Sequence, residues 1–154
     1  MKIAVVGAGN IGSTLGQRWL EQGHSVHFAV RDLSAEKVQT LKNKLHENKL
    51  NKAMVSVIQE ALPDAEVILL AVPGKAVKDL IETLHPKLDD KIIIDASNNL
   101  AADVMHNFDR LRQLAPKAKL YQAFNSLGWE NFANPSLMGQ PIDHFYAGMR
   151  GMGS

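Results

Sequence analysis

The chain has 154 residues, of which 45% are hydrophobic and 21% charged, and its formal net charge is +1. This length predicts a single globular domain, and the near-neutral charge argues against a nucleic-acid partner. The chain has no cysteine, which excludes disulfides and thiolate metal sites and fits a reducing cytoplasm. It shows neither a secretory leader nor a run of the roughly 20 apolar residues that a membrane helix needs, so we expect a cytoplasmic protein without a membrane partner.

The first predicted unit is a strand, a glycine turn and a helix. Gly7, Gly9 and Gly12 form a G-x-G-x-x-G between an apolar strand over residues 2–6 and an amphipathic helix over 10–22, which Gly23 ends. In dinucleotide-binding folds the first glycine allows the turn, the second lets a pyrophosphate approach, and the third lets the helix pack closely. The N–H groups at the helix start then face the anion. The turn is therefore predicted to bind a pyrophosphate.

Strands and helices alternate along the rest of the chain. Further strands are expected over residues 25–30, 54–57, 66–72, 91–95, 119–124 and 145–147. A helix is expected over 33–49 with Ser34 as its N-cap, and a brief helix is expected to end at Leu62. A third helix is expected after Pro73 and Gly74, with an apolar stripe of Ala76, Val77, Leu80, Ile81 and Leu84. A fourth, which Pro116 ends, has the stripe Val104, Phe108, Leu111 and Leu114. A polar loop, Ser97, Asn98 and Asn99, follows the strand over 91–95.

This alternation predicts an α/β fold with a doubly wound, mostly parallel sheet of central strand order 3-2-1-4-5-6. The Rossmann-type nucleotide-binding domain is expected to span residues 1–150. Residues 151–154 are expected to be a frayed tail or a remnant of cloning.

Arg31 directly follows the second strand, where NAD enzymes usually carry an acidic residue. An arginine there can pair with the 2′-phosphate of NADP, and such a charge-assisted bond contributes about 1.5–3 kcal/mol. Lys37 can add a second positive charge. Asp32 keeps an NAD reading open, but the sequence favours NADP.

No conventional catalytic residue and no metal site is predicted. The six histidines are scattered without metal-ligand spacing, and Ser13, Ser97 and Ser126 lack a nucleophile-elbow context. Hydride transfer between two bound cofactors needs proximity and orientation more than an acid or a base. The missing acid–base groups are therefore compatible with a cofactor-to-cofactor oxidoreductase.

Segments 2–16, 23–31, 65–73, 92–98 and 122–128 resemble the NADP oxidoreductase family that depends on the deazaflavin coenzyme F420. The most specific are D-A-S-N at 95–98 and Q-A-F-N-S-L-G at 122–128. The resemblance implies an NADP-binding Rossmann domain with a second cofactor, a deazaflavin or flavin, over the nicotinamide. It assigns the pyrophosphate to Gly7, Gly9, Asn10, Ile11 and Gly12, the 2′-phosphate to Arg31, and the nicotinamide half to Ala71, Val72, Pro73, Ser97 and Asn98.

The chain departs from this family's pattern at three places. Val30 stands where the family often has a small polar residue, and Gln122 where it tends to have lysine. The family also continues beyond the strand matching 145–148 with a helix and a strand that help to form the second-cofactor site. NADP binding is expected to survive that difference better than catalysis does.

Two functions remain open from the sequence. One is an NADPH-dependent oxidoreductase that passes hydride to a deazaflavin or flavin-like acceptor. The other is a non-catalytic NADP(H)-binding module or sensor. The nucleotide domain of a hydroxyacid or imine reductase is less favoured, because those enzymes usually need an additional helical domain. Apolar positions near the end of the chain leave a homodimer open.

Overall fold

The computed structural model describes residues 1–98 and 107–148. Its strands are β1 Lys2–Val6, β2 Ser25–Val30, β3 Ala53–Val57, β4 Val67–Leu70, β5 Ile92–Asp95, β6 Lys119–Ala123, β7 Ser136–Leu137, β8 Gln140–Pro141 and β9 Tyr146–Gly148. Its helices are α1 Asn10–Glu21, α2 Glu36–Glu47, α3 Ile58–Ala61, α4 Gly74–Leu84, α5 Phe108–Leu114 and α6 Glu130–Ala133, with a 3₁₀ turn at His85–Lys87.

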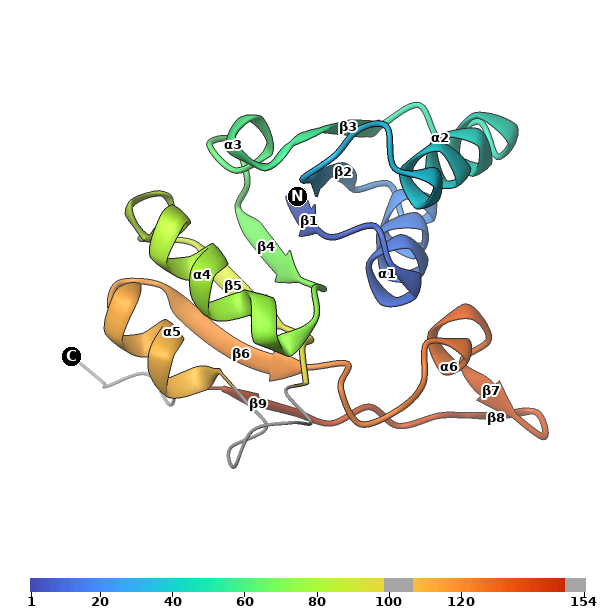
Figure 1. Ribbon diagram of the computed structural model, residues 1–154. Helices are drawn as coiled ribbons and strands as arrows, with labels where there is room; N and C mark the ends of the chain where they lie inside the picture. Colours follow the sequence, from blue (N-terminus) through green and yellow to red (C-terminus); the bar gives the residue numbers. More distant parts are fainter. Residues whose placement is uncertain (99–106, 149–154) are drawn as a thin grey trace.

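Seven of these strands form one sheet in the order β3-β2-β1-β4-β5-β6-β9 (Figure 1). Strands β1 to β6 are parallel to their neighbours, and β9 runs antiparallel to β6. The predicted α/β fold with a doubly wound, mostly parallel sheet is therefore confirmed. Because parallel strands point the same way, the loops after β1, β2, β4 and β5 lie along the same edge of the sheet.

Two apolar clusters cover the two faces of the sheet. On one face, α3, α4 and α5 pack against β1, β4, β5 and β6 through residues such as Leu62, Ile81, Leu111 and Ile68. On the other face, α1 and α2 pack against β1 and β2 through residues such as Leu15, Leu41 and Phe28. Helices on both faces bury both sides of the central strands, which explains why Val67, Ile68, Leu69 and Leu70 are all buried.

Strand β4 is shorter than the predicted run over residues 66–72. The Ala71 N–H still donates to the Val6 carbonyl at 2.9 Å, so the ladder continues one residue beyond the strand. Pro73 is then the N-cap of α4 and has no N–H with which to extend the ladder. The chain consequently leaves the sheet here, which puts the loop over 71–73 beside the glycine turn.

The prediction that Ser34 caps a helix starting at residue 33 is wrong. Helix α2 begins at Glu36, its N-cap is Ala35, and no side chain caps it. The Ser34 hydroxyl and N–H instead donate to Oδ1 of Asp32, at 2.6 and 2.8 Å. Serine and aspartate compete for local backbone groups in this way, so a serine before a helix is not always its cap.

Between the predicted strands over 119–124 and 145–147, the chain forms α6 and the hairpin of β7 and β8. The hairpin has a two-residue loop, Met138–Gly139. A glycine in such a loop is typical of a β-hairpin, but strands of two residues are too short to be predicted from the sequence pattern. Asn99, Val104 and the tail over 151–154 lie outside the described residues. In the described part of the chain, no helix has the length and hydropathy to span a bilayer.

Candidate functional site

Gly7 connects the end of β1 to the loops after β2 and β4. Its φ of +111° is one that residues with a side chain rarely adopt. Its N–H donates to the Ala29 carbonyl at 3.0 Å, and a Cβ atom at this position would overlap the Ala71 carbonyl oxygen. The fold itself therefore requires glycine here.

Gly12 and Gly9 differ sharply in what surrounds them. A Cβ atom on Gly12 would lie 2.5 Å from the Gly7 carbonyl oxygen, so this glycine allows α1 to pack closely on the turn. A Cβ atom on Gly9 would meet no atom within 4 Å, and its extended backbone suits any residue. Packing does not explain Gly9, and the open space above it is what a pyrophosphate would need.

Helix α1 starts at this turn with its N-terminal N–H groups uncapped by side chains. Gly9 is the N-cap, and the first turn contains no acidic residue. The first residues are Asn10, which is exposed, and Ile11, which is half-buried. An uncapped helix N-terminus favours an anion through its N–H groups and its dipole. The predicted pyrophosphate residues thus lie together in one turn.

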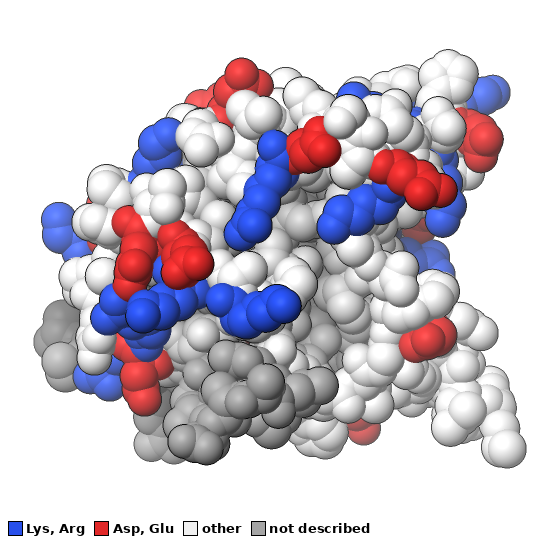
Figure 2. All heavy atoms as spheres, viewed as in Figure 1, with Lys and Arg blue, Asp and Glu red and all other residues white. Residues whose placement is uncertain are grey.

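A cleft of about 370 Å³ opens beside the turn, between the end of β2 and the start of α4. Arg31, Lys37 and Lys75 line it, together with Val72 and Pro73. Figure 2 shows Lys and Arg side chains around a hollow in the middle of this face. All three cations are exposed, and none forms an ion pair with a described residue. The cleft is therefore a site of positive potential suited to an anionic ligand.

Asp32 also lines the cleft, but one of its carboxylate oxygens is occupied by Ser34. The Ser34 hydroxyl and then its N–H hold the pKa of the Asp32 carboxyl below its ordinary value. The carboxylate is thus tied to its own turn. Its other oxygen, Oδ2, is not used by Ser34, so the alternative in which Asp32 binds the ribose hydroxyls of NAD stays open.

Lys75 is the cleft residue that sequence reasoning missed. It is the second residue of α4, and Lys37 is the second residue of α2. The helix dipole disfavours a cation at a helix N-terminus. A lysine at the start of a predicted helix is therefore a sign of an anionic ligand that the sequence alone can show. That signal carries weight only once the fold shows both lysines beside Arg31.

The loops after β5 and β6 are held together by side-chain hydrogen bonds. Ser97 is 3% exposed, and its hydroxyl and N–H donate to Oδ1 of Asp95 at 2.6 and 2.9 Å. Asn98 donates from Nδ2 to the Asn125 carbonyl at 3.0 Å. Neither Ser97 nor Asn98 lines the cleft beside Arg31. The hydrogen bonds described for these two predicted site residues therefore hold the start of the segment after β5 to Asp95 and to the segment after β6.

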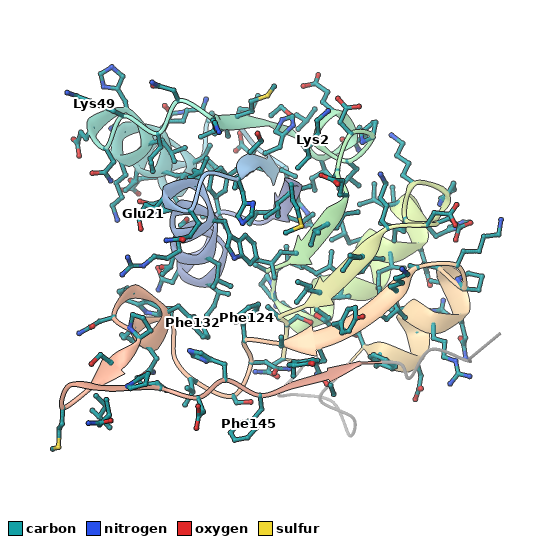
Figure 3. The ribbon with its side chains drawn as sticks, turned by 180° about the vertical axis from the view of Figure 1, so that it is seen from behind. Lys2, Glu21, Lys49, Phe124, Phe132 and Phe145 are labelled. Carbon is teal, nitrogen blue, oxygen red and sulfur yellow. The ribbon has the colours of Figure 1, made fainter. Side chains whose placement is uncertain are left out.

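An aromatic cluster attaches the segment after β6 to α1. Phe124 has φ +64°, unusual for a bulky residue, and its ring lies 6.3 Å from that of Trp19 and 5.4 Å from that of Phe132. Figure 3 shows Phe124 and Phe132 next to one another and Phe145 on the outside. Next to this cluster, an apolar groove of about 280 Å³ is lined by Ile94, Tyr121, Ala123, Phe124, His144, Phe145 and Tyr146.

His27, on β2, does not line the cleft beside Arg31. Its Nε2 is 2.7 Å from the Ser56 hydroxyl, which itself donates to the Val57 carbonyl. The tautomer of His27 determines which of the two groups donates in this contact. Among the described residues, no group of three or more histidine or acidic side chains could hold a metal ion.

We expect His27 to make the fold sensitive to acid. Burial lowers the pKa of His27, against the smaller opposing effect of Glu60 and Asp64. The unfolded chain then binds the proton more readily, so the free energy of unfolding should fall as the pH drops through the unfolded-state pKa, about 6.5. Urea unfolding at pH 7.5 and 5.5 should show a smaller pH dependence for His27→Gln than for the parent. An unchanged dependence in His27→Gln would contradict this expectation.

Comparison with known proteins places the chain among nucleotide-dependent oxidoreductases. The family model described as NADP oxidoreductase, coenzyme F420-dependent, matches residues 2–99. A glycerol-3-phosphate dehydrogenase [NAD(P)+] of Lysinibacillus sphaericus is 31% identical over 117 residues, which cover 71% of this chain and 35% of that protein. The chain spans only about a quarter to a third of the first such curated relatives, 26% and 35%.

Solved structures match the fold at lower identity. A proposed F420-dependent NADP-reductase from an Arthrobacter species superimposes with a TM-score of 0.82 at 22% identity, over 98% of this chain and 74% of that one. A reductive aminase from Aspergillus terreus, in complex with NADPH, superimposes with a TM-score of 0.61 at 20% identity, over 84% and 42%. These likenesses establish the Rossmann-type fold.

Proposed function

Because the chain belongs to the coenzyme F420-dependent NADP oxidoreductase family, we propose that it transfers hydride between NADP(H) and a deazaflavin or flavin-like acceptor. In this proposal the glycine turn, with Gly7, Gly9, Asn10, Ile11 and Gly12, binds the pyrophosphate. Arg31 and Lys37 bind the 2′-phosphate. Ala71, Val72, Pro73, Ser97 and Asn98 border the nicotinamide half.

The observation that carries the NADP part is the charge at the end of β2. Arg31 and Lys37 face one cleft without an ion-pair partner among the described residues, whereas Asp32 is bonded to Ser34. NAD could use Oδ2 of Asp32 for its ribose hydroxyls but would leave both cations without a partner. Two unpaired cations instead suit the additional phosphate of NADP.

Support for hydride transfer comes from the family and from the hydrogen bonds of Ser97 and Asn98. Bound NADP(H) would supply or accept the hydride, so the chain's own residues need only bind and orient. The hydrogen bonds of Ser97 to Asp95 and of Asn98 to Asn125 would keep the nicotinamide side of the site in one geometry. No step in this proposal requires a side-chain acid or base.

Arg31→Ala tests the NADP assignment. The parent is expected to bind NADPH more tightly than NADH, and the variant should lose most of that preference. Loss of one charge-assisted bond of about 1.5–3 kcal/mol corresponds to an affinity about 10- to 100-fold weaker for NADPH. Isothermal titration calorimetry with both nucleotides measures this, with Arg112→Ala, an exposed arginine on α5, as the control. Equal affinities in the parent would refute the assignment.

The alternative is a non-catalytic NADP(H)-binding module or sensor, and turnover separates the two. The favoured function predicts NADPH oxidation that depends on a deazaflavin, FMN or FAD acceptor. Tight NADPH binding without turnover on any of these acceptors would favour the module. The oxidoreductase and the non-catalytic module would use the same NADP(H) site, so calorimetry of nucleotide binding does not distinguish them.

We further propose that the protein acts in the cytoplasm as a homodimer. Support comes from the exposed apolar side chains of Leu137, Met138, Phe145 and Tyr146, which are 66–96% exposed. Sedimentation equilibrium at micromolar concentration would detect the dimer, and a monomer at all concentrations would exclude it.

A further inference from the structure

Lys75 faces the nucleotide cleft from the wall opposite Arg31, and we propose that it is a third cation for the 2′-phosphate. This inference rests on the proposed NADP function and adds a specificity-determining residue to that site. Arg31 and Lys37 come from β2 and α2, whereas Lys75 comes from α4. All three line the same cleft of about 370 Å³. The phosphate would thus be held from two sides.

The walls of the cleft leave a suitable place for the rest of the nucleotide. Apolar side chains line it between the cations, among them Ala35, Val38, Ile58, Ala76 and Leu80. Ligand sites commonly combine such an apolar lining with a few charged groups that fix orientation. An adenine ring could lie against this lining while its ribose phosphate meets the cations at the rim.

The charge around Lys75 is unbalanced without a ligand. Lys75 has no hydrogen bond or ion pair with any described residue, and the first turn of α4 contains no acidic side chain. The dipole of α4 opposes a cation at this end of the helix. The residues that line the cleft include three cations but one acidic residue, Asp32. Oδ1 of Asp32 accepts a hydrogen bond from Ser34. A phosphate dianion between the two walls would compensate this excess of positive charge.

Lys78 provides a matched comparison on the same helix. It is also exposed, and it lines a neighbouring hollow together with Lys75, Asn107 and Arg110, but unlike Lys75 it does not line the nucleotide cleft. A general effect of removing positive charge from α4 should therefore appear equally in Lys75→Gln and Lys78→Gln. An effect through the 2′-phosphate should appear in Lys75→Gln alone.

The test is calorimetric titration of NADPH and of NADH into the parent, Lys75→Gln, Lys75→Arg and Lys78→Gln. Lys75→Gln is expected to bind NADPH about fivefold more weakly, as for one solvent-exposed charge pair, and to bind NADH within about twofold of the parent. Lys75→Arg should restore the parent's affinity for NADPH, and Lys78→Gln should leave it unchanged. The melting temperature of each variant reports whether it is folded.

The outcomes separate this inference from the function on which it rests. If the parent prefers NADPH but Lys75→Gln binds it equally well, or loses NADPH and NADH affinity alike, the role of Lys75 is overturned and the NADP assignment stands. If the parent does not prefer NADPH, the proposed function itself fails, and this inference fails with it. Selective loss for NADPH, rescued by arginine, establishes the third cation.

Discussion

Gly9→Val is expected to abolish NADPH binding while leaving the fold intact. The side chain would occupy the open space above Gly9, where a Cβ atom meets no protein atom within 4 Å and the backbone already suits any residue. In the proposed complex that space holds the pyrophosphate. Displacing it would remove several hydrogen bonds of about 1–1.5 kcal/mol each, so binding should weaken at least about 100-fold.

Two measurements make this result interpretable. The melting temperature of Gly9→Val should stay close to that of the parent, because no packed atom is displaced. Gly9→Ala, with a smaller side chain in the same space, should lose less affinity than Gly9→Val in the same calorimetric titration. A folded Gly9→Val variant that still binds NADPH would show that the ligand does not use this turn.

Gly7→Ala, by contrast, should destabilise the fold by about 2–5 kcal/mol. An alanine at φ +111° costs about 1–2 kcal/mol. Its Cβ atom would also overlap the Ala71 carbonyl oxygen, and overpacking of this kind costs about 1–3 kcal/mol. Because that carbonyl belongs to the backbone after β4, it cannot rotate away as a side chain would. Denaturation in urea measures the loss.

Gly23→Ala is the matched control for this loss. Gly23 follows α1 with φ +89°, but a Cβ atom there would meet nothing within 4 Å. It should therefore show only the conformational cost, about 1–2 kcal/mol. Equal losses at Gly7 and Gly23 would contradict the proposed contact between Gly7 and the Ala71 carbonyl.

The two substitutions divide the glycine motif into separate roles. Gly7 and Gly12 are required by the backbone atoms around them, whereas no protein atom lies where a side chain of residue 9 would begin. A structural account of the motif alone would explain the first two and leave Gly9 unexplained. The combination of unexplained open space, an uncapped helix and unpaired cations in the adjoining cleft is what supports a nucleotide at this place.

The proposed acceptor side of the site has a different kind of support. The described hydrogen bonds of Ser97 and Asn98 go to protein atoms. The apolar groove lined by Phe124 and Tyr146 has aromatic side chains and no lysine, arginine, aspartate or glutamate among its lining residues. The turnover assay with deazaflavin and flavin acceptors is therefore the decisive experiment for catalysis, whereas the binding variants decide the nucleotide.

Much of the fold could be predicted because its signals are local. Alternating apolar strands and amphipathic helices place β1, β2, β4 and β5 nearly where the structure has them, and the glycine spacing identifies the turn. The sequence also predicts the position of Arg31 directly after β2, since that position depends only on where the strand ends. Short elements were lost: the hairpin of β7 and β8 has strands too short to show periodicity.

Only the tertiary structure decided which distant residues share a site. Arg31 and Lys75 become neighbours across one cleft because the strand order β2-β1-β4 places their loops on the same edge of the sheet. The Ser34 side chain, which alone looks like a helix cap, bonds to Asp32. Periodicity along a chain encodes each helix and strand, whereas the pairing of charges and the space above Gly9 arise from non-local packing. The sequence by itself therefore determined the kind of fold and the place of its glycine turn, and packing decided which charges line the cleft beside that turn.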